Sequence, residues 1–231
     1  MLTPAEFEAI RLTLFVSLVA VAASLPLAVA LGWLLAKHDF PGKFVLETLV
    51  NLPLVLPPVV TGYLLLVTFG RRGPIGGFLE NVLGLRFIFD WKGAALASAV
   101  VAFPLLVRPI RLAFASIDDR LFHAARTLGA TRWDAFWSIM VPLARPGILS
   151  GSVLAFARSV GEFGATIMIA GNIPGQTRTM SLAIYSSLEA PGQTDSPVRL
   201  VLVSIAIAAA ALLAGELLER RGRRRLLGAT A

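Results

Sequence analysis

The chain alternates long apolar runs with short polar segments. Three runs without a charged residue cover 12–36, 48–70 and 93–107, and two apolar runs with few charges follow. An α-helix needs about 20 mostly apolar residues to cross the hydrocarbon core of a bilayer. The pattern therefore predicts one all-α membrane domain over residues 1–231. Its five or so spans are expected near 12–36, 48–70, 93–115, 147–171 and 199–218.

The composition indicates a membrane protein and argues against disulfide-linked, metal-binding and nucleic-acid-binding proteins. Of the 231 residues 56% are hydrophobic and 15% are charged, whereas a soluble domain carries about 25% charged residues. The chain has no cysteine, which excludes disulfides and thiolate metal sites. Its two histidines, His38 and His123, lie in different polar segments, so no metal site is expected. The net charge of +7 reflects basic residues beside apolar runs, so membrane lipid is expected as a partner and nucleic acid is not.

The most polar interruption, residues 116–146, has the pattern of two short helices with a hinge. Ser116 fits a capping position for the first helix, and Gly129 stands where that helix would stop. Thr131 fits a second cap, and Pro142 marks the expected end of the second helix. From this pattern alone, an amphipathic connector on the membrane surface is an equal alternative.

The second apolar run contains three prolines, Pro53, Pro57 and Pro58. Proline inside a helix removes a backbone hydrogen bond and kinks or breaks the helix. In a membrane, freed backbone groups are tolerated only against protein or a water-lined cavity. This span is therefore expected either to line a path or to pack as a kinked helix.

The fourth run contains two ionisable residues, Arg158 and Glu162, spaced four apart. Charges inside a span are functional hypotheses by default, and an ion pair within one helix is the alternative. We predict such a pair, which holds the span in register. Further on, residues 180–188 are weakly apolar and too short to span, which indicates a re-entrant or interfacial helix.

The sequence contains no Walker lysine motif, no nucleophile elbow and no metal-ligand spacing. We therefore expect no catalytic residue and no cofactor in this chain. Any ATP chemistry must come from another chain.

The interruption at 116–146 resembles the EAA loop of ABC importer permeases. His123, Ala124 and Ala125, followed by Gly129 and Ala130, match that motif except that His123 stands where the family usually has Glu. The resemblance implies a cytoplasmic coupling helix that docks on an ATP-hydrolysing subunit. The implied coupling residues are His123, Ala124, Ala125, Thr127, Leu128, Gly129 and Ala130.

Three further segments, 52–58, 155–165 and 172–178, resemble the permease subunits of molybdate ABC transporters. The resemblance implies the type I importer permease fold in a bacterial cytoplasmic membrane, with molybdate as cargo and sulfate or tungstate as alternatives. It also implies a homodimer, two ATP-binding subunits that use ATP and Mg, and a periplasmic or lipoprotein oxyanion-binding protein. An ion-gradient-driven carrier is the less favoured alternative, because such carriers usually show inverted repeats and buried coupling carboxylates.

An oxyanion path needs hydrogen-bond donors without a deep electrostatic trap, because the anion must also leave. Neutral polar side chains and helix-breaking residues suit this requirement. The expected path candidates are Asn51, Pro57, Pro58, Thr61, Ser159, Gly161, Gly164 and Thr166.

Placing residues 116–146 in the cytoplasm fixes the orientation, with the N-terminus outside and the C-terminus inside. The cytoplasmic segments then hold most of the basic residues, including the cluster at 220–225, as the positive-inside rule requires. The segment 71–92 is an unusually basic outside loop in this arrangement.

Overall fold

The computed structural model describes residues 2–189 and 196–228, with side chains up to Leu217 apart from Ser196. The side chains of the basic cluster at 220–225, predicted as a cytoplasmic anchor, lie outside the described residues. Every regular element in the described part of the chain is helical, which confirms the all-α prediction.

Four helices are long: α1 (Pro4–Lys37), α5 (Trp91–Ala115), α8 (Val141–Val160) and α11 (Ser196–Gly228). The shorter helices are α2 (Lys43–Val55), α3 (Pro58–Phe69), α4 (Gly76–Leu83), α6 (Asp119–Thr127), α7 (Arg132–Ala135), α9 (Gly164–Ala170) and α10 (Met180–Glu189). A π-helical turn at Phe136–Met140 joins α7 to α8.

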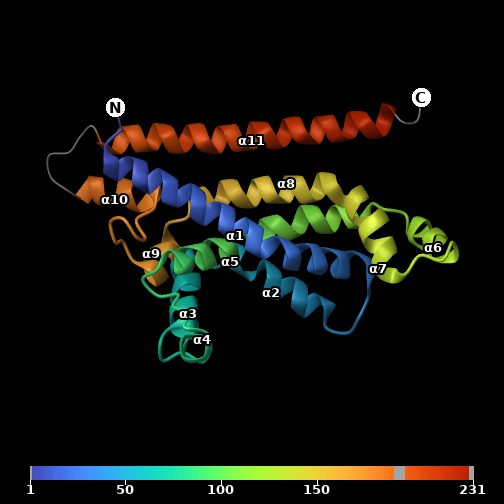
Figure 1. Ribbon diagram of the computed structural model, residues 1–231, viewed down its shortest axis with the longest axis horizontal. Coiled ribbons are helices and arrows are strands. Elements are labelled where there is room, and N and C mark those ends of the chain that lie inside the picture. The colour runs from blue at the N-terminus through green and yellow to red at the C-terminus, as the bar shows by residue number, and fades with distance from the viewer. Residues whose placement is uncertain (1, 190–195, 229–231) are drawn as a thin grey trace.

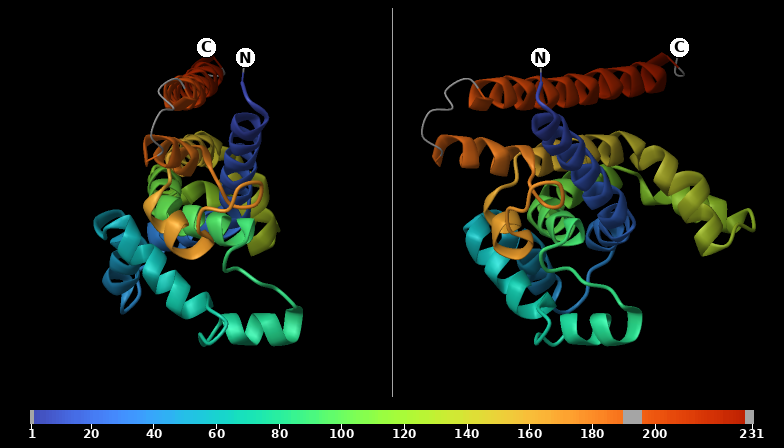
Figure 2. Two further views of the ribbon diagram at one scale, coloured as in Figure 1. Left: turned by 90° about the vertical axis from the view of Figure 1, so that its left-hand side faces the viewer. Right: turned by 60° about the vertical axis from the view of Figure 1, so that its left-hand side comes forward.

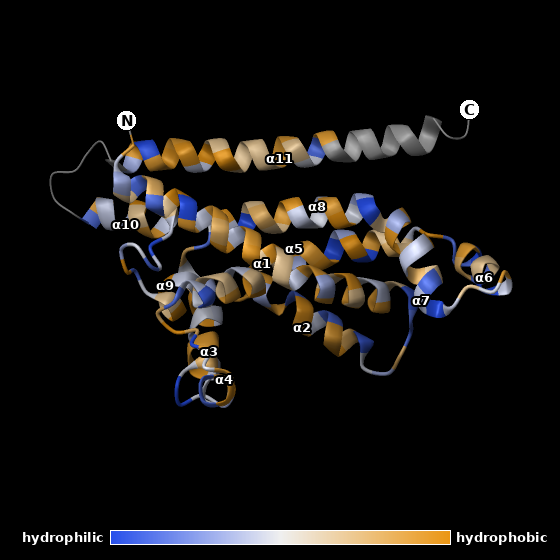
Figure 3. Cartoon of the chain, in the orientation of Figure 1, coloured by the Kyte–Doolittle hydropathy of each residue, from blue (hydrophilic) through white to orange (hydrophobic). Residues whose placement is uncertain are grey.

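Four segments are long and apolar enough to cross a membrane, and the bent pair α2–α3 makes up to five. They are Pro4–Lys37, Trp91–Ala115, Arg132–Val160 and Pro197–Leu217. The long helices run along the longest axis of the molecule (Figure 1), and the residues coloured in them are mostly hydrophobic (Figure 3). This arrangement agrees with the predicted number of about five spans.

The core lies where α1, α5 and α8 pack together. Leu106, Ile110 and Phe114 of α5 are completely buried there, together with Ala28 of α1 and Ala144 of α8. Lipid tails are as apolar as these side chains, so close van der Waals packing stabilises the contact more than removal from water does. By contrast, α3 and α4 extend away from the bundle (Figure 2).

The first span is longer than predicted, because α1 begins at Pro4 and not near residue 12. The Thr3 side chain accepts a hydrogen bond from the Glu6 backbone, and the Glu6 side chain accepts one from the Thr3 backbone. This capping box satisfies backbone donors that a helix start leaves unpaired. The charged residues before the apolar run therefore belong to the helix.

The second span is not one continuous helix. It bends by 115° between α2 and α3, at the Leu56–Pro57 junction, where Leu56 closes α2 and Pro57 precedes α3. Pro53 remains inside α2. The prediction that the prolines break or kink this run is therefore correct, and the break falls at the double proline.

The predicted fourth span, 147–171, is wrong as a single helix. The continuous segment runs from Arg132 to Val160, and Gly161 closes α8 before α9 begins at Gly164. Pro142 does not end a helix, because the π-helical turn precedes it and Val141 already bonds to the Phe136 carbonyl, five residues back. This displaced hydrogen-bond ladder accommodates a residue without an N–H.

The cap predicted at Ser116 is also wrong. Ser116 closes α5, and Asp118 caps α6 by accepting a hydrogen bond from the Arg120 backbone. Because α5 continues to Ala115, the serine still belongs to its last turn. The second cap is as predicted: the Thr131 side chain accepts a hydrogen bond from the Asp134 backbone.

Candidate functional site

The seven predicted coupling residues lie together on α6 and the turn that follows it. No residue of α6 is buried, and the helix stands at one end of the molecule, away from the main bundle (Figure 1). Leu128 is 89% exposed, and Leu121, Trp133 and Trp137 nearby are also exposed. These apolar side chains come from α6, the turn after it, α7 and the π-helical turn. Exposed apolar side chains near one another indicate a contact surface for another protein.

Gly129 makes the hinge of this surface. Its φ of +96° lies in the left-handed region that side chains with a Cβ rarely adopt. The Ala130 backbone donates to the Ala125 carbonyl, which completes the end of the helix. The sharp turn places the start of α7 directly after α6.

The far end of α1 holds the start of α6 in place, which the sequence did not reveal. The Lys37 ammonium lies 2.6 Å from the Asp119 carboxylate and also donates to the Ile117 carbonyl at 2.5 Å. One turn earlier, the Trp33 ring packs edge-on against Phe136, with ring centres 5.2 Å apart. The first span and the candidate coupling helix are therefore directly connected.

Two helix breaks meet in the opposite half of the molecule. A Cβ added at Gly62 of α3 would lie 2.7 Å from the Ala165 backbone of α9, so α3 and α9 touch at this glycine. A Cβ added at Gly164 would lie 3.0 Å from Pro58. The structure thus brings the Pro57–Pro58 break close to the break at 161–163, and Gly161 forms the end of α8.

Three path candidates around these breaks carry buried hydroxyl groups. Thr61, Ser159 and Thr166 are buried, and none of their side-chain oxygens has a hydrogen-bond partner within the described residues. Burying a hydroxyl without a partner is unfavourable, and buried polar groups are usually bonded. Such groups fit a place where a polar ligand or water passes.

Arg158 and Glu162 are in contact, but not within one helix. Arg158 Nη1 lies 2.7 Å from Glu162 Oε2, and the other carboxylate oxygen accepts a hydrogen bond from the Ala165 backbone at 2.8 Å. Glu162 follows Gly161, so it stands after the end of α8 and is only 2% exposed. The expected geometry of one helical face is wrong, and the pair instead bridges the gap between α8 and α9.

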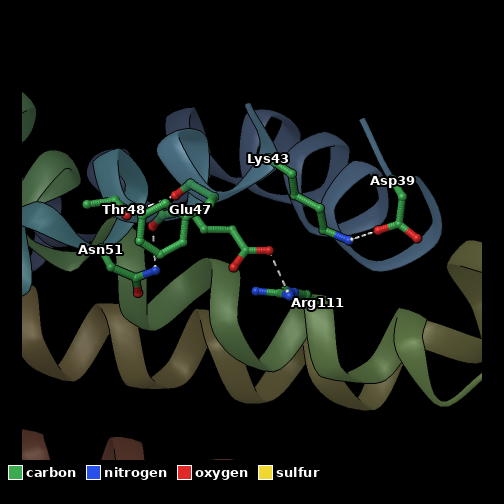
Figure 4. Close-up of polar contacts among 7 residues, drawn as sticks. Asp39, Lys43, Glu47, Thr48, Asn51 and Arg111 are labelled. Atoms are coloured by element: carbon green, nitrogen blue, oxygen red, sulfur yellow. Dashed lines mark hydrogen bonds and ion pairs between the residues drawn. The ribbon is translucent and has the colours of Figure 1, made fainter. Parts of the chain in front are cut away.

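Asn51, the remaining path candidate, lies on α2 and is already engaged. Its side-chain nitrogen donates to the Glu47 carbonyl at 2.6 Å, and its oxygen accepts from Arg108 Nε at 2.7 Å. Glu47 pairs with Arg111 at 2.9 Å (Figure 4). The sequence did not reveal a role for Glu47, Arg108 or Arg111, because the partners of these residues lie far away along the chain.

The loop before α2 carries one further ion pair. Lys43 Nζ lies 2.8 Å from the Asp39 carboxylate (Figure 4), and this hydrogen bond lowers the pKa of the Asp39 carboxyl. Across the described residues, no group of three or more His, Cys, Asp or Glu side chains could hold a metal ion.

Comparison with known proteins gives the class of this chain. Residues 28–224 match the family described as binding-protein-dependent transport system inner membrane component. The chain belongs to this family, and it is therefore a multi-pass inner-membrane protein and a permease subunit.

Within this family, the chain is similar to permeases of two transport systems. The chain is 53% identical over 224 residues to the molybdenum transport system permease protein ModB of Escherichia coli strain K12, covering 97% of this chain and 98% of that protein. It is 34% identical over 227 residues to the sulfate transport system permease protein CysT of the same strain, covering 97% and 80%.

A solved structure supports the fold. The chain is similar to a bacterial ABC transporter involved in the import of the acidic polysaccharide alginate, with a TM-score of 0.73 and 20% identity, covering 95% of this chain and 80% of that one. This likeness confirms the ABC importer permease fold.

Proposed function

We propose that this chain translocates molybdate across the bacterial cytoplasmic membrane as the permease subunit of an ATP-driven importer. The observation that carries the proposal is the 53% identity, over nearly the whole length of both chains, to a molybdenum transport permease. Membership of the binding-protein-dependent family also argues against the alternative of an ion-gradient-driven carrier.

The path in this proposal runs along the joined breaks of α2–α3 and α8–α9. Thr61, Ser159 and Thr166 supply neutral donors, and a tetrahedral dianion bound by such groups is held weakly enough to leave. Pro57, Pro58, Gly161 and Gly164 shape the backbone there. Two copies of the chain form the complete path between them.

Coupling runs through α6 in this proposal. Ala125, Thr127, Leu128 and Gly129 seat in a groove of an ATP-binding subunit, and each of two such subunits uses ATP and Mg. His123, Ala124 and Ala130 complete the surface. Closure of the ATP-binding subunits moves both coupling helices, and the dimer turns from inward-facing to outward-facing. ATP favours one of two states because it binds that state more tightly.

Delivery requires a periplasmic or lipoprotein oxyanion-binding protein, which docks on the outer face. The N-terminal start of α1, the loops around α4 and the loop before α10 lie on that face in this orientation. The C-terminus and α6 lie in the cytoplasm.

A second candidate cargo is sulfate or tungstate. The 34% identity to a sulfate permease favours sulfate, though less strongly than the identity to the molybdenum permease favours molybdate. The binding protein selects the cargo first. The permease must therefore be tested with more than one binding protein.

The test is uptake of labelled molybdate and labelled sulfate into proteoliposomes that contain the complete complex. We expect ATP-dependent molybdate uptake with a molybdate-binding protein, and little sulfate uptake with a sulfate-binding protein. Sulfate uptake at a higher rate than molybdate uptake would favour the second candidate. Uptake without ATP would overturn both.

A further inference from the structure

A polar stripe runs along the membrane-embedded helix α2. Lys43, Glu47 and Asn51 are spaced four residues apart, so they share one face of the helix. Figure 4 shows them in a row, with Thr48 beside them. Polar groups on a membrane span must face protein or water, so this face of α2 is not a lipid-facing surface.

Two arginines of α5 face this stripe. Arg111 Nη2 lies 2.9 Å from Glu47 Oε1, and Arg108 Nε donates to Asn51 Oδ1 at 2.7 Å. The two contacts are about one helical turn apart, because Glu47 and Asn51 are four residues apart on α2 and Arg108 and Arg111 are three residues apart on α5.

The charges of the stripe leave one guanidinium without an opposite charge. Lys43 is paired with Asp39, and Arg111 is paired with Glu47. Within the part of the chain that the structure describes, Arg108 contacts only the neutral amide of Asn51. Arg108 is exposed, and its Nε bond leaves both Nη groups available as donors.

We propose that Arg108, held by Asn51, is a binding subsite for a tetrahedral oxyanion in the cytoplasmic half of the path, an inference that rests on the proposed function. The planar guanidinium presents paired N–H groups that match two oxygens of an oxyanion. Glu47 neutralises Arg111, so the subsite carries one net positive charge. A single charge attracts the anion and still lets it leave.

The phosphate of a lipid headgroup has the same chemistry, and the geometry favours the transported anion over it. Lys43 is the first residue of α2, at its cytoplasmic end in the proposed orientation. Asn51 lies about 12 Å further along the helix. The Arg108 guanidinium is anchored at that depth by its hydrogen bond to Asn51. An arginine that reached for headgroups would extend toward the helix end.

Equilibrium dialysis with radiolabelled molybdate tests the subsite directly. The permease is purified with its ATP-binding subunits in phospholipid-free detergent, without nucleotide, and its assembly is checked by thermal melting. We expect Arg108→Gln to weaken molybdate binding by about tenfold, the usual consequence of losing a hydrogen bond to a charged group. Arg145→Gln is the matched control, because Arg145 is an exposed arginine of α8 outside the stripe, and it should bind as the wild type does.

Added phospholipid separates the two sources of the ligand. Molybdate binding that is unchanged by phospholipid supports the subsite, and displacement of molybdate by phospholipid overturns it. Binding by Arg108→Gln at the wild-type affinity also overturns it. If Arg108→Gln does not assemble, Arg108→Lys tests the subsite instead. Lysine lacks the planar pair of N–H donors of a guanidinium, so molybdate binding should weaken about threefold or more. Binding at the wild-type affinity would contradict the inference.

Uptake distinguishes this inference from the function on which it rests. ATP-dependent molybdate uptake by the wild-type complex, with unchanged binding in Arg108→Gln, overturns only the subsite. Failure of the wild-type complex to take up molybdate overturns the proposed function.

Discussion

Lys37 Nζ lies 2.6 Å from the Asp119 carboxylate, and this ion pair ties the last turn of α1 to the first turn of α6. The Lys37 side chain is 11% exposed and that of Asp119 is 66% exposed. The contact therefore lies at the edge of the bundle, where solvent screens it only from one side. If α6 docks on an ATP-binding subunit as proposed, this contact passes the motion of α6 to the first span.

Lys37→Met should uncouple ATP hydrolysis from transport. Without the ammonium, the Ile117 carbonyl and Asp119 lose their shared partner, and α6 can move without α1. We expect molybdate transported per ATP hydrolysed to fall several-fold while hydrolysis continues. A double-mutant cycle with Asp119→Asn should give a coupling energy of about 1 kcal/mol, because one partner is mostly exposed. An unchanged transport ratio in both single variants would contradict this role.

Substitutions on the coupling surface should block docking without preventing membrane insertion. Ala125→Trp overfills the contact with the ATP-binding subunit. Gly129→Val forces a branched side chain into a left-handed conformation, which costs about 1–2 kcal/mol. Gly129→Asn is the matched control, because asparagine tolerates that conformation. Co-purification of the ATP-binding subunit measures the effect, and wild-type transport by Ala125→Trp in a stable complex would disprove the docking assignment.

The Arg158–Glu162 pair should act on stability and not on anion binding. Removing either partner leaves the other charge without compensation, which costs about 3 kcal/mol for a buried pair. Glu162→Gln and Arg158→Gln should each lower the melting temperature of the complex, and the double variant should recover part of the loss. Transport abolished in Arg158→Gln with stability intact, and no recovery in the double variant, would instead identify a substrate-binding arginine.

Cysteine labelling tests the orientation, since the chain has no cysteine of its own. Gly76 is a poor position for the cysteine, because a Cβ there would collide with the Phe69 carbonyl. Asn81 and His38 are exposed on opposite sides of the predicted membrane. Asn81→Cys should react with an impermeant reagent from outside only, and His38→Cys from inside only. The reverse pattern would invert the proposed topology.

Local features of this chain were predictable from its sequence, and contacts between distant segments were not. The cap at Thr131, the turn at Gly129 and the break at the prolines depend on residues a few positions apart. The contact from Lys37 to Ile117 spans 80 residues and that from Arg108 to Asn51 spans 57. Such pairs follow from how α1, α2 and α5 pack, which local spacing does not encode.

The predicted helix boundaries were wrong where one local feature of the sequence outweighed another. Pro142 indicates a helix end, yet the π-helical turn before it removes the conflict. The apolar run at 147–171 indicates one span, yet α8 ends at Gly161, and the Glu162 side chain accepts a hydrogen bond from the Ala165 backbone at the start of α9. Hydropathy reports only that a segment is apolar, so it cannot distinguish a continuous span from two joined pieces.

The proposed path runs along the joined helix breaks, and removal of the buried hydroxyl groups beside them tests it most directly. The triple variant Thr61→Val, Ser159→Ala and Thr166→Val replaces by apolar groups of similar shape the three hydroxyls that have no hydrogen-bond partner in the described part of the chain. Because such replacement of an unpaired buried polar group is neutral or stabilising, the complex should melt at or above the wild-type temperature. Thr68→Val, whose hydroxyl already bonds to the Leu64 carbonyl, is the control.

The decisive measurement is ATP-dependent uptake of labelled molybdate by the triple variant in proteoliposomes. We expect uptake to fall by about tenfold or more while the complex stays intact and Thr68→Val transports normally. Uptake by the triple variant at the wild-type rate would contradict a path along α3 and α9.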